Sequence, residues 1–401
     1  MINAGDTTFV LISSALVAIM TPGLAFFYGG LVKRKNVLTI MMQSFISMGM
    51  VTVIWALLTF SLSFGTDVGG FIGGLDYLMM NGIGMEPSST FGTTIPFFAF
   101  FVFQMMFAII TPALITGAFT ERMNFKSYLI FLVIWSIVVY APLAHWVWGG
   151  GFIAKLGAID FAGGTVVHIS AGMAALASVF VLGKRKNTTH LPHNIPYVAL
   201  GTGLLWFGWY GFNAGSALAA NGQAAAAFVN TDLAASVAMI TWLFLSWVVD
   251  KRPSMVGALT GVLAGLVAIT PAAGYVTPSG ALLIGIIASI VCFYAIKFRM
   301  RMGWDDTLDV WGCHGVGGIV GSILTGVFAT KSIGGFSGLI EGNTDQFLAN
   351  IYGTAIAAVF AFVMTYLILR ILKAVMKISV ESKEQEDGLD RALHGEEAYD
   401  F

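Results

Sequence analysis

The sequence predicts an all-α polytopic membrane protein with eleven transmembrane helices. Of the 401 residues, 57% are apolar and only 10% are charged. Apolar runs of spanning length recur from end to end, and basic residues gather in alternate loops. A soluble globular protein carries roughly 25% charged residues, and a spanning helix needs about 20 apolar residues. A β-barrel is excluded because barrel strands alternate every second residue, whereas these runs are continuously apolar.

Each apolar run is expected to form one span. Five runs precede the polar loop 183–194, five follow it, and an eleventh comes last. The expected spans are 7–31, 37–64, 95–119, 127–147, 163–182, 196–219, 225–249, 255–272, 280–297, 309–329 and 347–372. They form a transmembrane domain over 1–377, with halves at 7–182 and 196–330, and a charged tail follows at 378–401.

The basic residues set the orientation of the chain. They fill alternate loops and the tail, and only Lys155 and Lys331 fall on the other side. By the positive-inside rule, the N-terminus lies outside and the tail is cytoplasmic. The N-terminal MINAGDTTFV has no basic leader before its apolar run, so a cleaved signal peptide is not expected.

Two histidines lie inside expected spans, each preceded by an aspartate at the same spacing. Asp160 precedes His168 by eight residues in the fifth span, and Asp306 precedes His314 by eight in the tenth. Five spans per half invert the second half, and inverted repeats usually place a transport site near the midplane. Eight helical residues rise about 12 Å in a hydrocarbon core about 30 Å thick. Both histidines should therefore reach the middle, unless the spacing recurs by chance.

An ionisable residue inside a span indicates function by default, because charge is costly there. His168 and His314 could remain neutral and hydrogen-bond to each other. The alternative is a buried pair that only fastens two helices together. Asp160 and Asp306 stand just before a helix, where capping of backbone N–H groups is a simpler role than ligand binding.

Three aromatic clusters stand out, at 101–108, 145–151 and 206–216. The second and third fall near the outer ends of spans, and the first should lie beside them. Tryptophan binds cations through its ring face, and a nearby serine oxygen could accept a hydrogen bond from an N–H donor. An interfacial aromatic belt is the alternative interpretation.

Other chemistries find little support in the sequence. It contains no HExxH, Walker A or GxSxG motif, no Cys/His ligand spacing and no carboxylate cluster typical of sodium sites. Cys292 and Cys313 lie in apolar stretches and do not form a disulfide framework. We therefore expect no enzyme activity, no cofactor, no metal and no nucleic-acid partner.

Several longer stretches, taken in order, are more specific than any single motif. They are TPGLAFFYGGLV with KNVL (21–38), FQMMFA (103–108), ITGAFTERMNF (115–125), LAHWVWGGG (143–151), GAIDFAGGTVVHISAG (157–172), GWYGFNAGS (208–216), TPAAGY (270–275), DDTLDVWGCHGVGGIVGS (305–322) and GLDRALHGEEAYDF (388–401). Along nearly its whole length the chain resembles the ammonium transporters, the Amt/MEP/Rh group. One departure is Trp311, where phenylalanine is expected.

The resemblance implies a role for each matching position. Ammonium would be recruited at an outer site, pass a gate of phenyl rings and enter a lumen with twin histidines. The outer site would comprise Phe107, Trp148 and Ser216, with Asp160 supporting the vestibule; the gate would comprise Phe107, Phe212 and Phe27; and the lumen would hold His168 and His314.

The resemblance also implies regulation and partners. It implies a homotrimer with one pore per subunit, in contact with membrane lipid, in the plasma or inner membrane of a prokaryote. A PII signal protein would bind the cytoplasmic face, and the tail would couple subunits. The tail residues that would regulate transport are Gly388, Leu389, Asp390, His394, Gly395, Glu396 and Tyr399, with Leu393 and Phe401 adding apolar docking surface.

A lumen of phenyl rings and neutral imidazoles cannot solvate a monovalent cation. Potassium has no proton to lose, whereas ammonium can lose one and pass as ammonia. The proton could return outside or cross by a separate relay, which leaves a channel and an electrogenic carrier both open. A sensor that binds ammonium and signals through its tail is the alternative function. The sequence does not distinguish methylammonium, CO2 or water as further substrates.

Overall fold

A computed structural model describes residues 1–188 and 191–399. Phe401, expected to help dock the tail, lies outside these residues. The described part is mainly helical, with one short antiparallel hairpin of β1 (Asp67–Val68) and β2 (Ile72–Gly73). Nine of its helical ranges are long and apolar enough to cross a membrane. Helices α9 (Ile195–Gly215) and α11 (Met255–Ile269) occupy the two remaining expected spans, so the predicted fold class is confirmed.

The helices of the first half follow the expected order, but several contain a π-helical segment. The elements are α1 (Ala4–Leu31), η1 (Arg34–Asn36), α2 (Val37–Ile54), η2 (Trp55–Thr59), α3 (Phe60–Phe64), η3 (Leu78–Met80), α4 (Phe97–Phe119), α5 (Phe125–Trp135), η4 (Ser136–Tyr140), α6 (Ala141–Val147), α7 (Phe152–Lys155), η5 (Gly164–Ile169) and α8 (Ser170–Leu182). Of these η elements, η2, η4 and η5 are π-helical.

The second half and the tail contain the remaining elements. They are α9, α10 (Gly222–Asp250), α11, α12 (Pro278–Met302), η6 (Trp311–Gly315), α13 (Val316–Phe328), α14 (Lys331–Gly334), η7 (Leu339–Glu341), α15 (Thr344–Val375), α16 (Ser382–Asp387) and η8 (Asp390–His394). The sixth span ends at Gly215 instead of residue 219. Leu218 there adopts a left-handed φ of 54°, and Asn221 caps α10 by accepting a hydrogen bond from the Ala224 N–H.

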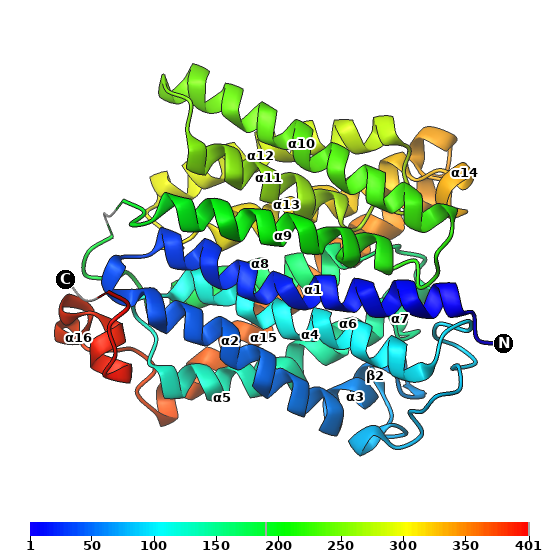
Figure 1. Cartoon of the computed structure of the whole chain (residues 1–401), viewed down its shortest axis with the longest axis horizontal. Coiled ribbons are helices and arrows are strands. Elements are labelled where there is room, and N and C mark those ends of the chain that lie inside the picture. The colour runs from blue at the N-terminus through cyan, green and yellow to red at the C-terminus, as the bar shows by residue number, and fades with distance from the viewer. Residues whose placement is uncertain (189–190, 400–401) are drawn as a thin grey trace.

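The first helices of the two halves, α1 and α9, pack along each other at the centre of the bundle (Figure 1). Helices α2 and α4 lie beside α1, whereas α10, α11 and α12 lie beyond α9. The N-terminus and the C-terminal tail are at opposite ends of the molecule (Figure 1). An odd number of spans places the two termini on opposite sides of a membrane, which agrees with this arrangement.

The two histidine segments pack reciprocally. η5 contacts α13, and η6 contacts α8. A Cβ on Gly172 would lie 2.1 Å from the backbone nitrogen of Gly315, and a Cβ on Gly318 would lie 2.9 Å from the Gly164 carbonyl oxygen. Gly172 and Gly318 each stand four residues after their histidine. The two halves therefore cross where only glycine permits the backbones to approach.

The described part of the tail lies against the membrane domain. The backbone of 378–380 pairs with 122–124, through the bridge between Met123 and Ser379 and a 2.9 Å bond from the Val380 N–H to the Arg122 carbonyl. The Leu389 side chain is buried. Ile378 and Val380 are buried as well, so backbone pairing and three apolar side chains hold the tail against the membrane domain.

Candidate functional site

A cavity of about 560 Å³ opens at the outer end of the bundle, on the N-terminal side. Its lining includes all four residues expected at the outer site: Phe107, Trp148, Asp160 and Ser216. They come from α4, the end of α6, the segment before η5, and the end of α9. Residues far apart in the sequence thus share one vestibule.

Asp160 acts as a cap on the segment that carries His168. Its carboxylate accepts hydrogen bonds from the backbone N–H groups of Gly163, Gly164 and Thr165 at 2.8, 2.7 and 2.7 Å. Its backbone carbonyl also accepts a 3.0 Å bond from the indole nitrogen of Trp148. Asp160 therefore shapes the vestibule through these bonds.

The Trp148 ring and the Ser216 hydroxyl present different chemistry to the vestibule. The indole N–H is already donated to Asp160, so the ring offers its π surface. The Ser216 hydroxyl donates to the Phe212 carbonyl at 2.9 Å, which leaves its oxygen lone pairs as acceptors. A π surface and a neutral acceptor suit a small cation with N–H donors.

Two phenyl rings close the inner end of the vestibule. The Phe107 and Phe212 rings stack with centroids 4.1 Å apart, and Trp148 meets Phe107 edge-on at 5.9 Å. Both phenyl side chains are buried. No polar atom bridges these rings in the described structure, so an ion reaching them would lose its hydration.

Behind the rings lies a cavity of only about 10 Å³, lined by the aromatic side chains of Phe27, Tyr28, Trp209 and Phe212, the imidazoles of His168 and His314, and aliphatic side chains. A cavity needs about 10–15 Å³ to hold one water. The lumen in this conformation therefore has room for roughly one molecule of that size.

The twin histidines meet in this lumen as the sequence predicted. Their Nδ1 atoms are 3.2 Å apart, and both rings are buried. One ring can donate and the other accept only if the second Nδ1 carries no proton, so a neutral pair satisfies the contact. The Trp209 ring stacks on His168 at 5.3 Å and is held by a 2.8 Å bond from its N–H to the Thr270 hydroxyl.

A second large cavity, about 450 Å³, opens at the cytoplasmic end and is lined by Phe27, His314, Asp306 and Asp309. Phe27 thus lies between the lumen and this inner vestibule. The Asp306 carboxylate accepts a 2.7 Å bond from the Trp311 N–H at the start of η6. Asp160 and Asp306 therefore stand at opposite ends of the pathway, as expected. The Trp311 ring packs edge-on against Trp304 at 5.5 Å.

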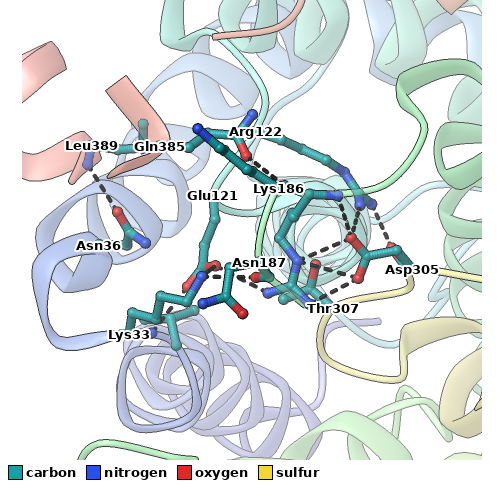
Figure 2. A network of polar contacts seen from close by, with 12 residues as sticks. Lys33, Asn36, Glu121, Arg122, Lys186, Asn187, Asp305, Thr307, Gln385 and Leu389 are labelled. Atoms are coloured by element: carbon teal, nitrogen blue, oxygen red, sulfur yellow. Dashed lines mark hydrogen bonds and ion pairs between the residues drawn. The ribbon is translucent and has the colours of Figure 1, made fainter. Parts of the chain in front are cut away.

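Sequence reasoning missed a buried ionic network beside the inner vestibule (Figure 2). Asp305 pairs with Arg122 at 2.7 Å and with Arg185 at 2.8 Å, and Arg185 also pairs with Glu121 at 3.0 Å. Lys33 joins Glu121 at 3.1 Å. The adjacent acids at 305–306 and the basic loop 184–186 were visible signals, but their pairing was not.

The first of the expected regulatory residues of the tail contact the loop between α1 and α2 and the start of α2. The Leu389 N–H donates to the Asn36 side chain at 2.8 Å, and the Asp390 carboxylate accepts from the Thr39 N–H at 2.8 Å. Gly388 has a left-handed φ of 104°, and a Cβ there would lie 2.7 Å from Lys35.

The end of the described tail makes ring contacts. His394 packs edge-on against Phe125 at 5.0 Å, and the Tyr399 hydroxyl lies 3.0 Å from His193 Nε2. Gly395 adopts a left-handed φ of 68°, and Glu396 is exposed. These contacts join the tail to the start of α5 and to the loop before α9. Within residues 1–188 and 191–399, no cluster of three His, Cys, Asp or Glu side chains is placed to hold a metal ion.

Comparisons with known proteins agree along the whole chain. Residues 8–399 match the family model described as Ammonium Transporter Family. A relative named ammonium transporter from Bacillus subtilis is 48% identical over 399 residues and covers 98% of each chain. Another with that name, from Aquifex aeolicus, is 48% identical and covers 100% of this chain and 94% of the relative.

Solved structures give the same picture. Saccharomyces cerevisiae Mep2 has a TM-score of 0.90 at 33% identity, over 95% of this chain and 88% of Mep2. A structure described as Sensor Amt Protein has a TM-score of 0.90 at 30% identity, over 97% of this chain and 98% of that one.

Proposed function

Because the chain belongs to the ammonium transporter family, we propose that it moves ammonium nitrogen across a membrane as ammonia. The narrow lumen between the phenyl rings and the twin histidines carries this proposal, since its volume of about 10 Å³ excludes a hydrated ion. Ammonium is recruited by the Trp148 π surface and the Ser216 oxygen, and loses a proton before the rings.

Deprotonation separates ammonium from potassium. Desolvating a monovalent cation in an apolar channel costs several kcal/mol or more, and the Phe107–Phe212 stack offers no polar replacement for its water. Ammonium avoids this cost by leaving its proton behind, whereas potassium has no proton to leave. Ammonia then donates to or accepts from the His168–His314 pair and reaches the inner vestibule. No chemical conversion beyond proton transfer is involved.

The proton could return outside, which makes the protein an ammonia channel, or cross by a separate relay through the histidines, which makes it an electrogenic carrier. Purified protein in liposomes distinguishes them. In the first case an ammonium gradient makes the interior more alkaline without a current, because ammonia takes up a proton inside. In the second case the proton arrives with the ammonia, so a current flows and internal pH changes little. If neither the pH change nor the current exceeds that of empty liposomes, the result would contradict transport.

A sensor is the second candidate function. Two observations favour it: the likeness to the structure described as Sensor Amt Protein, and a tail docked on cytoplasmic loops where it could report a change in the pore. A sensor would bind ammonium at the same outer vestibule with little flux. The liposome measurement therefore separates the two functions.

We further propose a homotrimer in the inner membrane of a prokaryote, in contact with lipid, with a PII signal protein as the cytoplasmic partner. The family resemblance supports these assignments. The docked tail supports regulation, because Gly388, Leu389 and Asp390 touch the loop between α1 and α2. Crosslinking in native membranes tests the trimer, and pull-down with purified PII protein tests the partner.

A further inference from the structure

His145 lies outside the pathway described above, yet it is fully buried beside the outer vestibule. It stands in α6, three residues before Trp148. Its Nδ1 lies 3.0 Å from the Ser63 carbonyl oxygen, and its Nε2 lies 2.9 Å from the Asp67 carboxylate. Both ring nitrogens therefore face oxygen atoms.

These two partners determine the protonation of the ring. A backbone carbonyl is an acceptor only, and so is an ionised carboxylate. The hydrogen bond from Lys155, 2.5 Å from the second Asp67 oxygen, lowers the pKa of Asp67 to about 2, with a further contribution from the bond to His145. Asp67 is therefore ionised at neutral pH. A neutral imidazole can donate from only one nitrogen, so both contacts are satisfied only by imidazolium.

Other charged groups near α6 have partners of their own. Lys155 is bonded to Asp67, and Asp76 accepts a 2.7 Å bond from the Thr66 N–H. Asp160 is occupied by the cap at the start of η5. None of these three is hydrogen-bonded to the His145 ring within the described residues, so Asp67 is the direct counter-charge.

The His145 ring also supports the turn that aims Trp148. Gly149 follows Trp148, and a Cβ there would lie 2.1 Å from the Ser63 carbonyl oxygen and 2.7 Å from His145 Nδ1. The Gly151 N–H donates to the His145 carbonyl at 2.9 Å. The backbone after Trp148 is thus packed directly on the His145–Ser63 contact, while the tip of the indole is held by Asp160.

We propose that His145, as an imidazolium held between Ser63 and Asp67, is a positioning residue that fixes Trp148 at the outer cation site. Removing the Asp67 counter-charge leaves this ring without its ionic partner, loosens the turn and weakens capture of ammonium. This role rests on the proposed function, but its structural part can be measured without transport.

The protonation is measured directly on the intact protein in lipid. Ring ¹⁵N labelling of the six histidines gives two signals for each ring, and the His145→Gln variant identifies the pair from His145. We expect both ring nitrogens to carry protons at neutral pH. A nitrogen without a proton would overturn the inference, whatever the transport result.

The positioning role is measured on the Trp148 indole N–H signal, assigned with Trp148→Leu. Asp67→Asn removes the counter-charge without changing any residue of α6, and it should shift the Trp148 indole signal. Lys331→Gln is the matched control, because Lys331 is the other outer lysine, is exposed at the start of α14, and is not bonded to His145 or Asp67 within the described residues. An indole signal that stays unchanged in Asp67→Asn would overturn the positioning role.

Transport supplies the last readout. In Asp67→Asn the half-saturating ammonium concentration should rise about tenfold, the scale of losing a hydrogen bond to a charged group, with little change in maximal flux. An unchanged half-saturating concentration in Asp67→Asn would refute the inference, whereas absent flux in wild type would instead refute the proposed function.

Discussion

Replacing Asp305 with asparagine should destabilise the protein far more than replacing an aspartate in an exposed ion pair. The Asp305 carboxylate accepts from Arg122 and from the backbone and guanidinium of Arg185, at 2.7 to 3.2 Å. All three side chains are at most 4% exposed. Removing one partner of a buried pair costs about 3–5 kcal/mol, because charge is left uncompensated. We expect about 3 kcal/mol, since Arg185 keeps Glu121.

The matched control is Asp250→Asn. Asp250 pairs with Lys297 at 2.5 Å, but the side chains are 47% and 29% exposed. Such surface pairs contribute about 0–1 kcal/mol. Thermal unfolding of the purified protein in detergent should therefore show a clearly lower midpoint for Asp305→Asn than for Asp250→Asn. Equal midpoints would refute the view that this network holds the cytoplasmic loops together.

At acidic pH, the thermal unfolding midpoints of wild type and Asp305→Asn should become equal. Burial alone raises the pKa of Asp305, but hydrogen bonds and charge from Arg185 and Arg122 outweigh it, and its pKa lies below the usual value. Because the pKa of Asp305 is lower in the folded state, its ionised carboxylate stabilises the fold fully at pH values above the pKa of the unfolded chain, about 3.9. This stability is lost as pH falls through the pKa of the folded state. The two midpoints should converge below about pH 4, and a gap that persists in acid would contradict this.

Three further predictions concern the pathway and the tail. His168→Ala or His314→Ala should change ammonium conduction or selectivity while the protein stays folded; unchanged flux and selectivity in both would reduce the pair to a helix fastener. Trp148→Leu keeps apolar bulk but removes a cation–π contribution of about 2 kcal/mol, so the concentration dependence of uptake must shift, and an identical curve would exclude the site. Deletion from Gly388 onward should leave a folded membrane protein with altered transport or altered response to a PII protein; a truncated chain that behaves like the full one would show that the tail is passive.

The fold and the main axis of the pathway could be predicted because they depend on local patterns. Continuous apolar runs define spans whatever they pack against, and the equal spacing from Asp160 to His168 and from Asp306 to His314 survives in the structure as two caps and one histidine pair. Glycine four residues after each histidine allowed the crossing that brings them together.

The contacts that were missed join segments that are remote in sequence. Arg122 and Asp305 are 183 residues apart, and His145 and Asp67 are 78 apart, so no sequence spacing predicts either pair. The charge of the tail is evident from the sequence, whereas the burial of Ile378, Val380 and Leu389 depends on the surface that they meet. The π-helical segments were not predicted either, since one extra residue in a turn leaves no trace in an apolar run.

The central claim is that only an uncharged molecule passes between the phenyl rings and the twin histidines. It is tested most directly by loading liposomes containing the wild-type protein with a pH-sensitive dye and a potassium-sensitive dye, imposing equal inward gradients of ammonium or potassium, and recording the current. We predict internal alkalinisation or a proton-coupled current with ammonium, and potassium entry no faster than in empty liposomes. Entry of potassium at a rate comparable to ammonium would show that the lumen solvates cations, and would contradict the mechanism.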